Sequence, residues 1–156
     1  MKKVVLILLA VAFMVSFVVC SVNVTAAEEI MTEANNSEFA RFLRYGQTRA
    51  AVSAFVNEHF ARRIAFKGHI SLIYPTRSRM SPNTFDVDIW PGDFNSDDDI
   101  SMSPYFIIQG LNNPQEPLFQ PGNISIIADI MGIGDDGLSV LILPRHIERR
   151  PARPRR

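Results

Sequence analysis

The segment that follows residue 92 contains the residues whose types and spacing come nearest to a metal site. Oxygen-bearing side chains alternate in this segment and would supply positions one, three, five and seven of a calcium-binding loop: Asp93, Asn95, Asp97 and Asp99. The pattern then departs from a calcium loop, because position six, normally glycine, is Asp98, and position twelve, normally glutamate, is Pro104. One interpretation of this segment is therefore a calcium-binding loop, and the other is an acidic surface loop. The sequence indicates no other cofactor.

A second group of residues is typical of a binding surface. Asp86 and Asp88 alternate along an expected strand and so share one of its faces, with three aromatic residues close by in the sequence. We therefore predict a ligand-binding surface made of Asp86, Asp88, Trp90, Phe94 and Tyr105. The alternative is that the aromatic side chains close the ends of the fold.

Catalytic chemistry has little support in the sequence. His59, His69 and His146 are scattered, and none stands in a pattern known for a nucleophile or a zinc site. The only cysteine, Cys20, lies in the N-terminal apolar segment, so the rest of the chain has neither a disulfide nor a thiol nucleophile. We predict no catalytic residue and no enzymatic activity.

Two-residue alternation of apolar and polar residues predicts five strands. They are expected at residues 64–74, 85–89 and 105–111 and in the two arms of a hairpin within residues 119–143. In the first strand the even-numbered residues from Ile64 to Tyr74 are expected to be buried, and Gly68 indicates a bulge or a sharp coil. In the hairpin, the even-numbered residues from Ile124 to Ile130 should be buried, and the odd-numbered positions, including Asp129, should face solvent.

Helical spacing of apolar residues precedes the strands, in a segment of residues 37–62. One helix is expected after a Ser37 cap and is interrupted at Gly46, and Thr48 can cap a second. The apolar stripe of the second helix consists of Ala51, Val52, Phe55 and Phe60. We expect these helices to pack on the sheet; the alternative is an amphipathic element that binds a partner or a membrane surface through its arginines.

Five strands that follow two helices resemble an OB-fold over roughly residues 64–147. The resemblance rests on the glycine-interrupted first strand and on the Pro-Gly-Asn turn at residues 121–123. The chain looks similar to exported or membrane-anchored OB-fold proteins of the tRNA-anti-like group, given the upstream pattern of Tyr45, Gly46, Thr48 and Ala50. This resemblance implies a mainly β fold, with a five-stranded OB-like barrel and helices packed on one end. It also implies a binding surface for oligonucleotides, oligosaccharides or proteins.

The N-terminal segment, residues 1–26, has the features of a targeting signal. Lys2 and Lys3 precede an apolar run from Val4 to Val22, and small residues follow at residues 24–26. Cleavage by signal peptidase, an uncleaved membrane anchor and a lipidated Cys20 are the three alternatives. In each case the protein is exported, as a periplasmic, secreted or membrane-anchored protein, and it contacts a membrane only through this segment.

Charge is unevenly distributed along the chain, although 16 basic and 16 acidic residues give a formal net charge of zero. Two lysines near the N-terminus and five arginines in the tail leave residues 27–148 with a net charge of about −7. A segment with this net negative charge repels phosphate groups, so nucleic acid is a disfavoured ligand of residues 27–148.

The predicted organisation has five parts. They are a signal peptide or anchor (1–26), a spacer (27–36), a helical segment (37–62), an OB-like barrel (63–148) and a disordered basic tail (149–156). The expected function is that of an exported, non-enzymatic binding module of the cell envelope that interacts with an unknown protein partner. The alternatives are a nucleic-acid- or oligosaccharide-binding barrel and a secreted enzyme.

Overall fold

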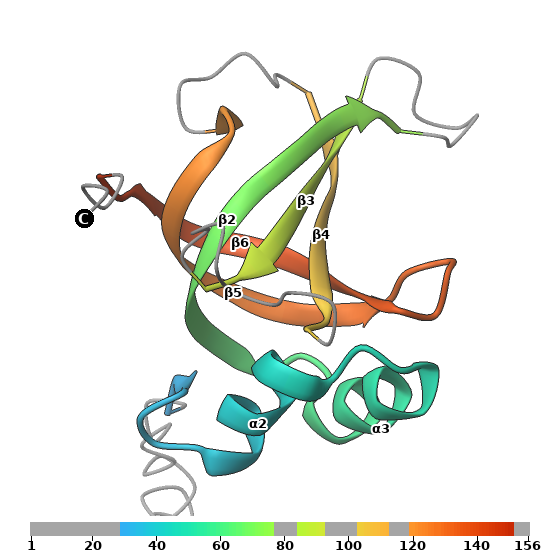
Figure 1. The fold of residues 1–156 in the computed structure, drawn as a ribbon. Coiled ribbons are helices and arrows are strands. Elements are labelled where there is room, and N and C mark those ends of the chain that lie inside the picture. The colour runs from blue at the N-terminus through green and yellow to red at the C-terminus, as the bar shows by residue number, and fades with distance from the viewer. Residues whose placement is uncertain (1–28, 77–83, 93–102, 113–118, 152–156) are drawn as a thin grey trace, which may run out of the picture.

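The computed structural model describes residues 29–76, 84–92, 103–112 and 119–151, which form a closed barrel with two helices at one end (Figure 1). In chain order the elements are β1 (Met31–Thr32), α2 (Ser37–Tyr45), α3 (Arg49–His59), β2 (Arg63–Pro75), β3 (Phe85–Pro91), β4 (Tyr105–Leu111), β5 (Gly122–Ile133) and β6 (Ser139–Arg149). The predicted fold class, mainly β with N-terminal helices and a five-stranded barrel, is confirmed.

The barrel closes because β2 pairs with a strand on each side. The order along the sheet is β2-β3-β4-β6-β5, and β5 pairs again with β2. All these pairs are antiparallel except β4 with β6, which run parallel. The first part of β2, from Arg63 to Ile70, pairs with β5, and the part from Gly68 to Pro75 pairs with β3. This closed arrangement is consistent with an OB-like fold.

Alternating side chains of the strands fill the barrel. The predicted buried face of β5 is confirmed, since Ile124, Ile126, Ala128 and Ile130 are each at most 1% exposed. The opposite face differs from the prediction, because Asn123 and Asp129 are buried as well. Each fully buried isoleucine contributes about 1.5–3 kcal/mol of transfer free energy relative to an exposed one, so the barrel interior is a major source of stability.

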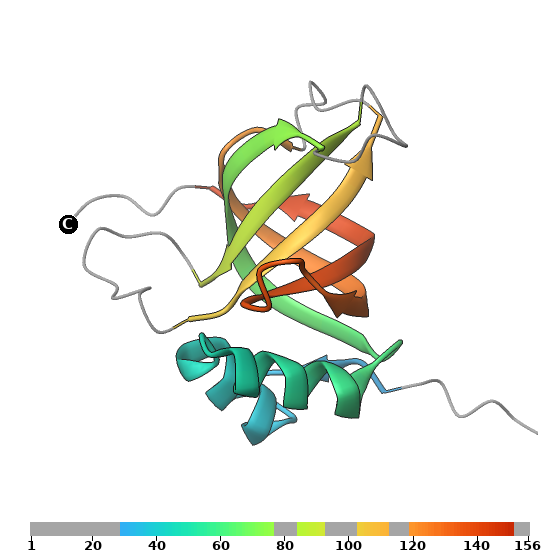
Figure 2. The same ribbon diagram turned by 90° about the vertical axis from the view of Figure 1, so that its right-hand side faces the viewer.

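The two helices close one end of the barrel, as Figure 2 shows from the side. The ring of Phe42 stacks on Phe55 with 3.9 Å between ring centroids, and Phe39 stacks on Phe55 at 5.8 Å. Phe39 and Phe42 also make edge-to-face contacts with Phe66 of β2 and Phe106 of β4. This aromatic layer joins the helices to the barrel core.

Of the two predicted helix caps, Thr48 is found and Ser37 is not. Thr48 caps α3 as predicted, with its Oγ1 accepting a hydrogen bond from the backbone N–H of Ala51 at 3.1 Å. For α2 the cap is Asn36, whose Oδ1 accepts from Phe39 N–H at 2.8 Å, and Ser37 is the first helical residue. The prediction that Phe60 belongs to the apolar stripe is wrong, because this residue follows the end of α3 and is 60% exposed.

Two boundaries also differ from the prediction. The expected spacer contains β1. In this strand Met31 is buried and pairs in parallel with Ile64, near the start of β2. The final strand extends to Arg149, the first residue assigned to the tail, whose guanidinium donates hydrogen bonds to the backbone oxygens of Gln120 and Pro121. Residues 152–156 lie outside the described part of the chain.

A β-bulge at Ser71 changes which face of β2 is buried. Ile70 pairs with Ile89 and Leu72 pairs with the next residue of β3, Asp88, so Ser71 is an extra residue. Before the bulge the even-numbered residues point inward, and after it Ile73 packs on the core. The prediction that Leu72 and Tyr74 belong to the buried face is therefore wrong, and Leu72 is 53% exposed.

Gly68 has a role other than the predicted bulge. It lies in regular register between Pro91 of β3 and Ile124 of β5. A Cβ atom at this position would lie 2.7 Å from Cγ2 of Ile89. Glycine therefore allows the close approach of strands where β2 is paired on both sides.

Within the part of the chain that the structure describes, neither helix has the length and apolar character needed to cross a membrane. The predicted signal or anchor, residues 1–26, lies outside that part.

Candidate functional site: an acidic groove on the barrel

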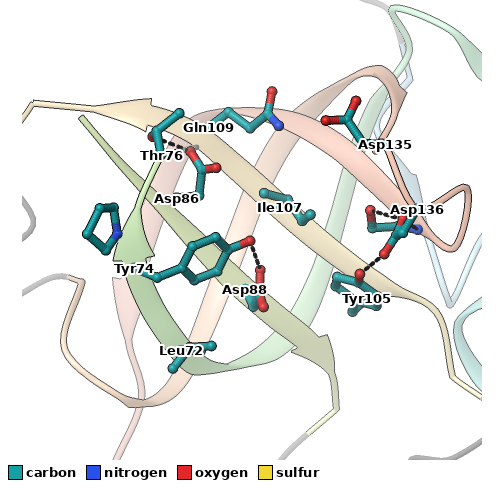
Figure 3. A pocket seen from close by; sticks show the side chains of 12 residues that line it. Leu72, Tyr74, Thr76, Asp86, Asp88, Tyr105, Ile107, Gln109, Asp135 and Asp136 are labelled. Atoms are coloured by element: carbon teal, nitrogen blue, oxygen red, sulfur yellow. Dashed lines mark hydrogen bonds between the residues drawn. The ribbon is translucent and has the colours of Figure 1, made fainter. Parts of the chain in front are cut away.

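An open groove of about 1000 Å³ lies on the outer face of β2, β3 and β4, beside the turn between β5 and β6 (Figure 3). Its lining residues are Leu72, Tyr74, Pro75, Thr76, Asp86, Asp88, Tyr105, Ile107, Gln109, Asp135, Asp136 and Ser139. The second and third strands of the barrel, β3 and β4, form its floor. In OB-folds this same face, with the flanking loops, is the usual ligand-binding surface.

Asp86 holds two walls of the groove together. Its Oδ1 accepts a hydrogen bond from the hydroxyl of Thr76 at 2.6 Å and another from the backbone N–H of Gly110 at 3.1 Å. Gly110 has a φ of 73° and lies where β4 carries an extra residue opposite β3, so the carboxylate supplies a partner that the strand ladder does not. Only 6% of Asp86 is exposed, which makes it a structural part of the groove.

Asp88 carries a negative charge that its surroundings destabilise. Its Oδ1 accepts a hydrogen bond from the hydroxyl of Tyr74 at 3.0 Å. Burial raises the pKa of Asp88 above its usual 3.8, against the lowering effect of the Tyr74 hydrogen bond, and the charges of Asp86 and Asp136 raise the pKa further. The ionised Asp88 therefore lacks a compensating positive charge among these neighbours.

The turn between β5 and β6 supplies the other two carboxylates. Asp136 accepts hydrogen bonds from Leu138 N–H at 2.9 Å, from Ser139 N–H and hydroxyl at 3.1 and 2.9 Å, and from the hydroxyl of Tyr105. These bonds fix the turn and join it to β4 (Figure 3). Asp135, next to it, is exposed to solvent.

Three of the five predicted binding residues come together in this groove: Asp86, Asp88 and Tyr105. Trp90 is not a lining residue; its ring packs beside Tyr105, with 5.4 Å between centroids, and supports that side chain. Phe94 and the predicted calcium ligands Asp93, Asn95, Asp97 and Asp99 lie outside the described residues.

Sequence reasoning missed Tyr74, Leu72 and Thr76 as groove residues. Their strand alternates regularly up to Ile70, and nothing in the letters of residues 70–74 marks the bulge that turns Tyr74 outward. The only local signal was Thr76 at the strand end, a hydroxyl residue directly after Pro75. Asp129, which was expected to face solvent, does not line the groove and instead pairs with Arg63 and Arg145.

A second cluster of polar residues lies on the helices. One ligand atom each from Glu38, Glu58 and His59 lies within 4.8 Å of the others. The sequence placed no site at His59, because Glu38 is distant in the chain and only the fold brings it near. This cluster is separate from the groove, since none of its residues lines it.

Residues 34–131 match the family model described as "Domain of unknown function (DUF4839)". The chain belongs to this family. The DUF4839 match includes both helices, β2 to β4 and most of β5, and so it includes Asp86, Asp88 and Tyr105 but ends before Asp135. No curated protein and no solved structure matches the chain. The narrower resemblance to the tRNA-anti-like group stays a prediction.

Proposed function

We propose that this DUF4839 protein is an exported, non-enzymatic binding module of the cell envelope whose groove receives a positively charged segment of a partner protein. The observation that carries the proposal is the gathering of four carboxylates and two tyrosines in one open groove on β3 and β4. Support for export comes from the N-terminal sequence, where two lysines precede a long apolar run.

The four carboxylates divide into two roles. Asp86 and Asp136 accept several internal hydrogen bonds and shape the groove. Asp88, with its raised pKa, and the exposed Asp135 are the charges best placed to meet a ligand. A lysine or arginine of a partner would give Asp88 the opposite charge that it lacks, and the tyrosines offer ring faces on which a guanidinium can stack.

The same charges argue against the alternatives. Phosphate groups of a nucleic acid would meet like charge along the whole groove. An enzyme with a hydroxyl nucleophile would need that hydroxyl to be available, whereas the hydroxyls of Thr76 and Ser139 both donate to carboxylates that hold the walls. An uncharged oligosaccharide would stack on the tyrosines and donate hydroxyl hydrogen bonds to the carboxylates, but it would leave the charge of Asp88 uncompensated.

The test is to measure the binding of fluorescent arginine-rich peptides to the purified protein by anisotropy, at low and high salt. The variant D88N/D135N should weaken binding about tenfold or more, because it removes two ligand-facing charges. Binding should also weaken with added salt. The control E33Q/E148Q removes two exposed carboxylates that do not line the groove and should bind like the wild type.

Two results would contradict the proposal. One is equal loss of binding in the control and in the groove variant, which would mean that only net charge matters. The other is tighter binding of an oligosaccharide or an oligonucleotide than of the peptides, unaffected by D88N/D135N. The groove variant should remain folded, because a neutral amide in place of the Asp88 carboxylate removes the burial cost of the charge. Cell fractionation of the tagged full chain tests export.

A further inference from the structure

His59, the last residue of α3, is buried without a polar partner. Only 4% of this residue is exposed, and neither of its ring nitrogens has a hydrogen-bond partner among the described residues. Buried polar atoms are normally paired, so an orphaned pair of ring nitrogens requires an explanation. An imidazole nitrogen without a hydrogen-bond partner has a lone pair available for a metal ion.

Two carboxylates lie beside this ring. Glu38 comes from the first turn of α2 and Glu58 from the last turn of α3, and one ligand atom from each lies within 4.8 Å of one ring nitrogen and of the other carboxylate. Both glutamates are exposed, so their side chains are free to adjust toward an ion. The negative end of the α3 dipole is at this position and favours positive charge there.

We propose that Glu38, Glu58 and His59 bind a divalent transition-metal ion of the zinc type, which clamps α2 to α3. The donor set decides the class of ion: one imidazole and two carboxylates suit zinc, whereas calcium and magnesium prefer oxygen ligands alone. Three protein ligands leave the fourth tetrahedral position to water on the exposed side.

Aromatic packing holds the imidazole in place for this role. The Phe55 ring lies 4.8 Å from the His59 ring, centroid to centroid, and Phe55 is itself stacked between Phe39 and Phe42. The buried ligand thus comes from the layer that seals the barrel, and the two exposed ligands come from the surface. An ion at this position would connect the helix pair to that aromatic layer.

The experiment adds zinc sulfate to the metal-free full chain and follows the melting temperature, with affinity and stoichiometry measured by competition with a chromophoric chelator. Zinc should bind one to one and raise Tm by about 5 °C or more at saturation. Equal concentrations of calcium or magnesium should cause no shift in Tm that the substitution H59F removes. The substitutions E38Q and E58Q should each weaken zinc binding about tenfold or more, because each removes a charged ligand.

The decisive variant is H59F, which keeps a ring in the buried space and removes both nitrogens. It should melt no lower than the wild type without zinc and should show no zinc-dependent shift. The matched control is H146Q, which removes an exposed histidine elsewhere and should keep the full zinc response.

The proposal is overturned if H59F retains wild-type zinc affinity, if H146Q loses it, or if calcium stabilises the wild type as strongly as zinc and H59F abolishes that calcium effect. Should H59F fail to fold, the exposed substitutions E38Q and E58Q decide, and unchanged affinity in both overturns the proposal. None of these residues lines the groove, so this outcome is independent of the peptide-binding test.

Discussion

Asp129 shows how a single buried carboxylate joins three strands. Its two oxygens accept hydrogen bonds from Arg63 Nε on β2 at 2.9 Å and from Arg145 Nε on β6 at 2.6 Å. Burial alone would raise the pKa of Asp129, but the hydrogen bonds and charges of the two arginines outweigh it and hold the pKa below 3.8. The stabilisation that this carboxylate gives is therefore pH-dependent.

Replacing Asp129 with Asn should lower the free energy of unfolding by about 1–2 kcal/mol at pH 7, a modest loss because both arginines are partly exposed and screened. A carboxylate whose folded pKa is depressed stabilises the protein above its unfolded pKa and loses that effect as pH falls through the folded pKa. Urea unfolding from pH 7 to pH 2 should show a constant difference between wild type and D129N that shrinks only below about pH 3.8. A difference that is as large at pH 2 as at pH 7 would contradict this account.

At the scale of the elements, β2 is the strand that closes the barrel. It pairs with both β3 and β5 at residues 68–70, so its backbone there has a strand on each side. A side chain at Gly68 would meet Ile89 Cγ2 at 2.7 Å and the carbonyl oxygen of Trp90 at 3.1 Å. The backbone of Trp90 has little room to move, because Trp90 pairs with His69 of β2 and the preceding residue, Ile89, pairs with β4.

We expect G68A to lower the free energy of unfolding by about 1–3 kcal/mol through overpacking. The matched control is G132A on β5, where the nearest atom to an added Cβ is Leu141 Cδ1 at 3.9 Å. That change should be neutral or slightly stabilising, since alanine restricts the unfolded chain. Chemical denaturation of both variants checks the pair, and equal destabilisation would show that loss of glycine itself, rather than crowding, sets the cost.

Local patterns in the sequence predict most of these elements. The strand expected at residues 105–111 is found with those bounds, because its alternation and its ends are local properties. The face of Tyr74, the burial of Asp129 and the clustering of Glu38 with His59 depend on partners far away in the chain. Three of the twelve lining residues were thus predicted, Asp86, Asp88 and Tyr105, whereas the wall supplied by β2 was not.

At the scale of the whole molecule, the helices and the barrel share one core. Phe39 is fully buried between Phe55 of α3 and Phe66 of β2, so the same side chain contributes to both parts. Helices this short depend on such packing for their stability in water. The described residues should therefore unfold as one unit.

Replacing Phe39 with Ala tests whether the helices and the barrel unfold together. F39A should lower the free energy of unfolding by about 3–5 kcal/mol, the range for a buried aromatic residue. The single tryptophan, Trp90, lies on β3, so its fluorescence reports the barrel and far-UV circular dichroism reports the helices. In both wild type and F39A the two signals should change at the same urea concentration. Loss of the helical signal at lower urea would show that the helices are a separate unit.

The extra residue at Ser71 has a consequence for how this protein can diverge. If Ser71 instead took a regular place in the strand ladder, the end of β2 would continue the alternation of its first half, and Leu72 and Tyr74 would exchange faces with Ile73. The groove would lose one wall while every amino acid that forms it stayed in the chain. The groove is thus encoded in the register of β2 as well as in its residues, and a variant that keeps every groove residue would still lose this binding surface if that register slipped by one residue.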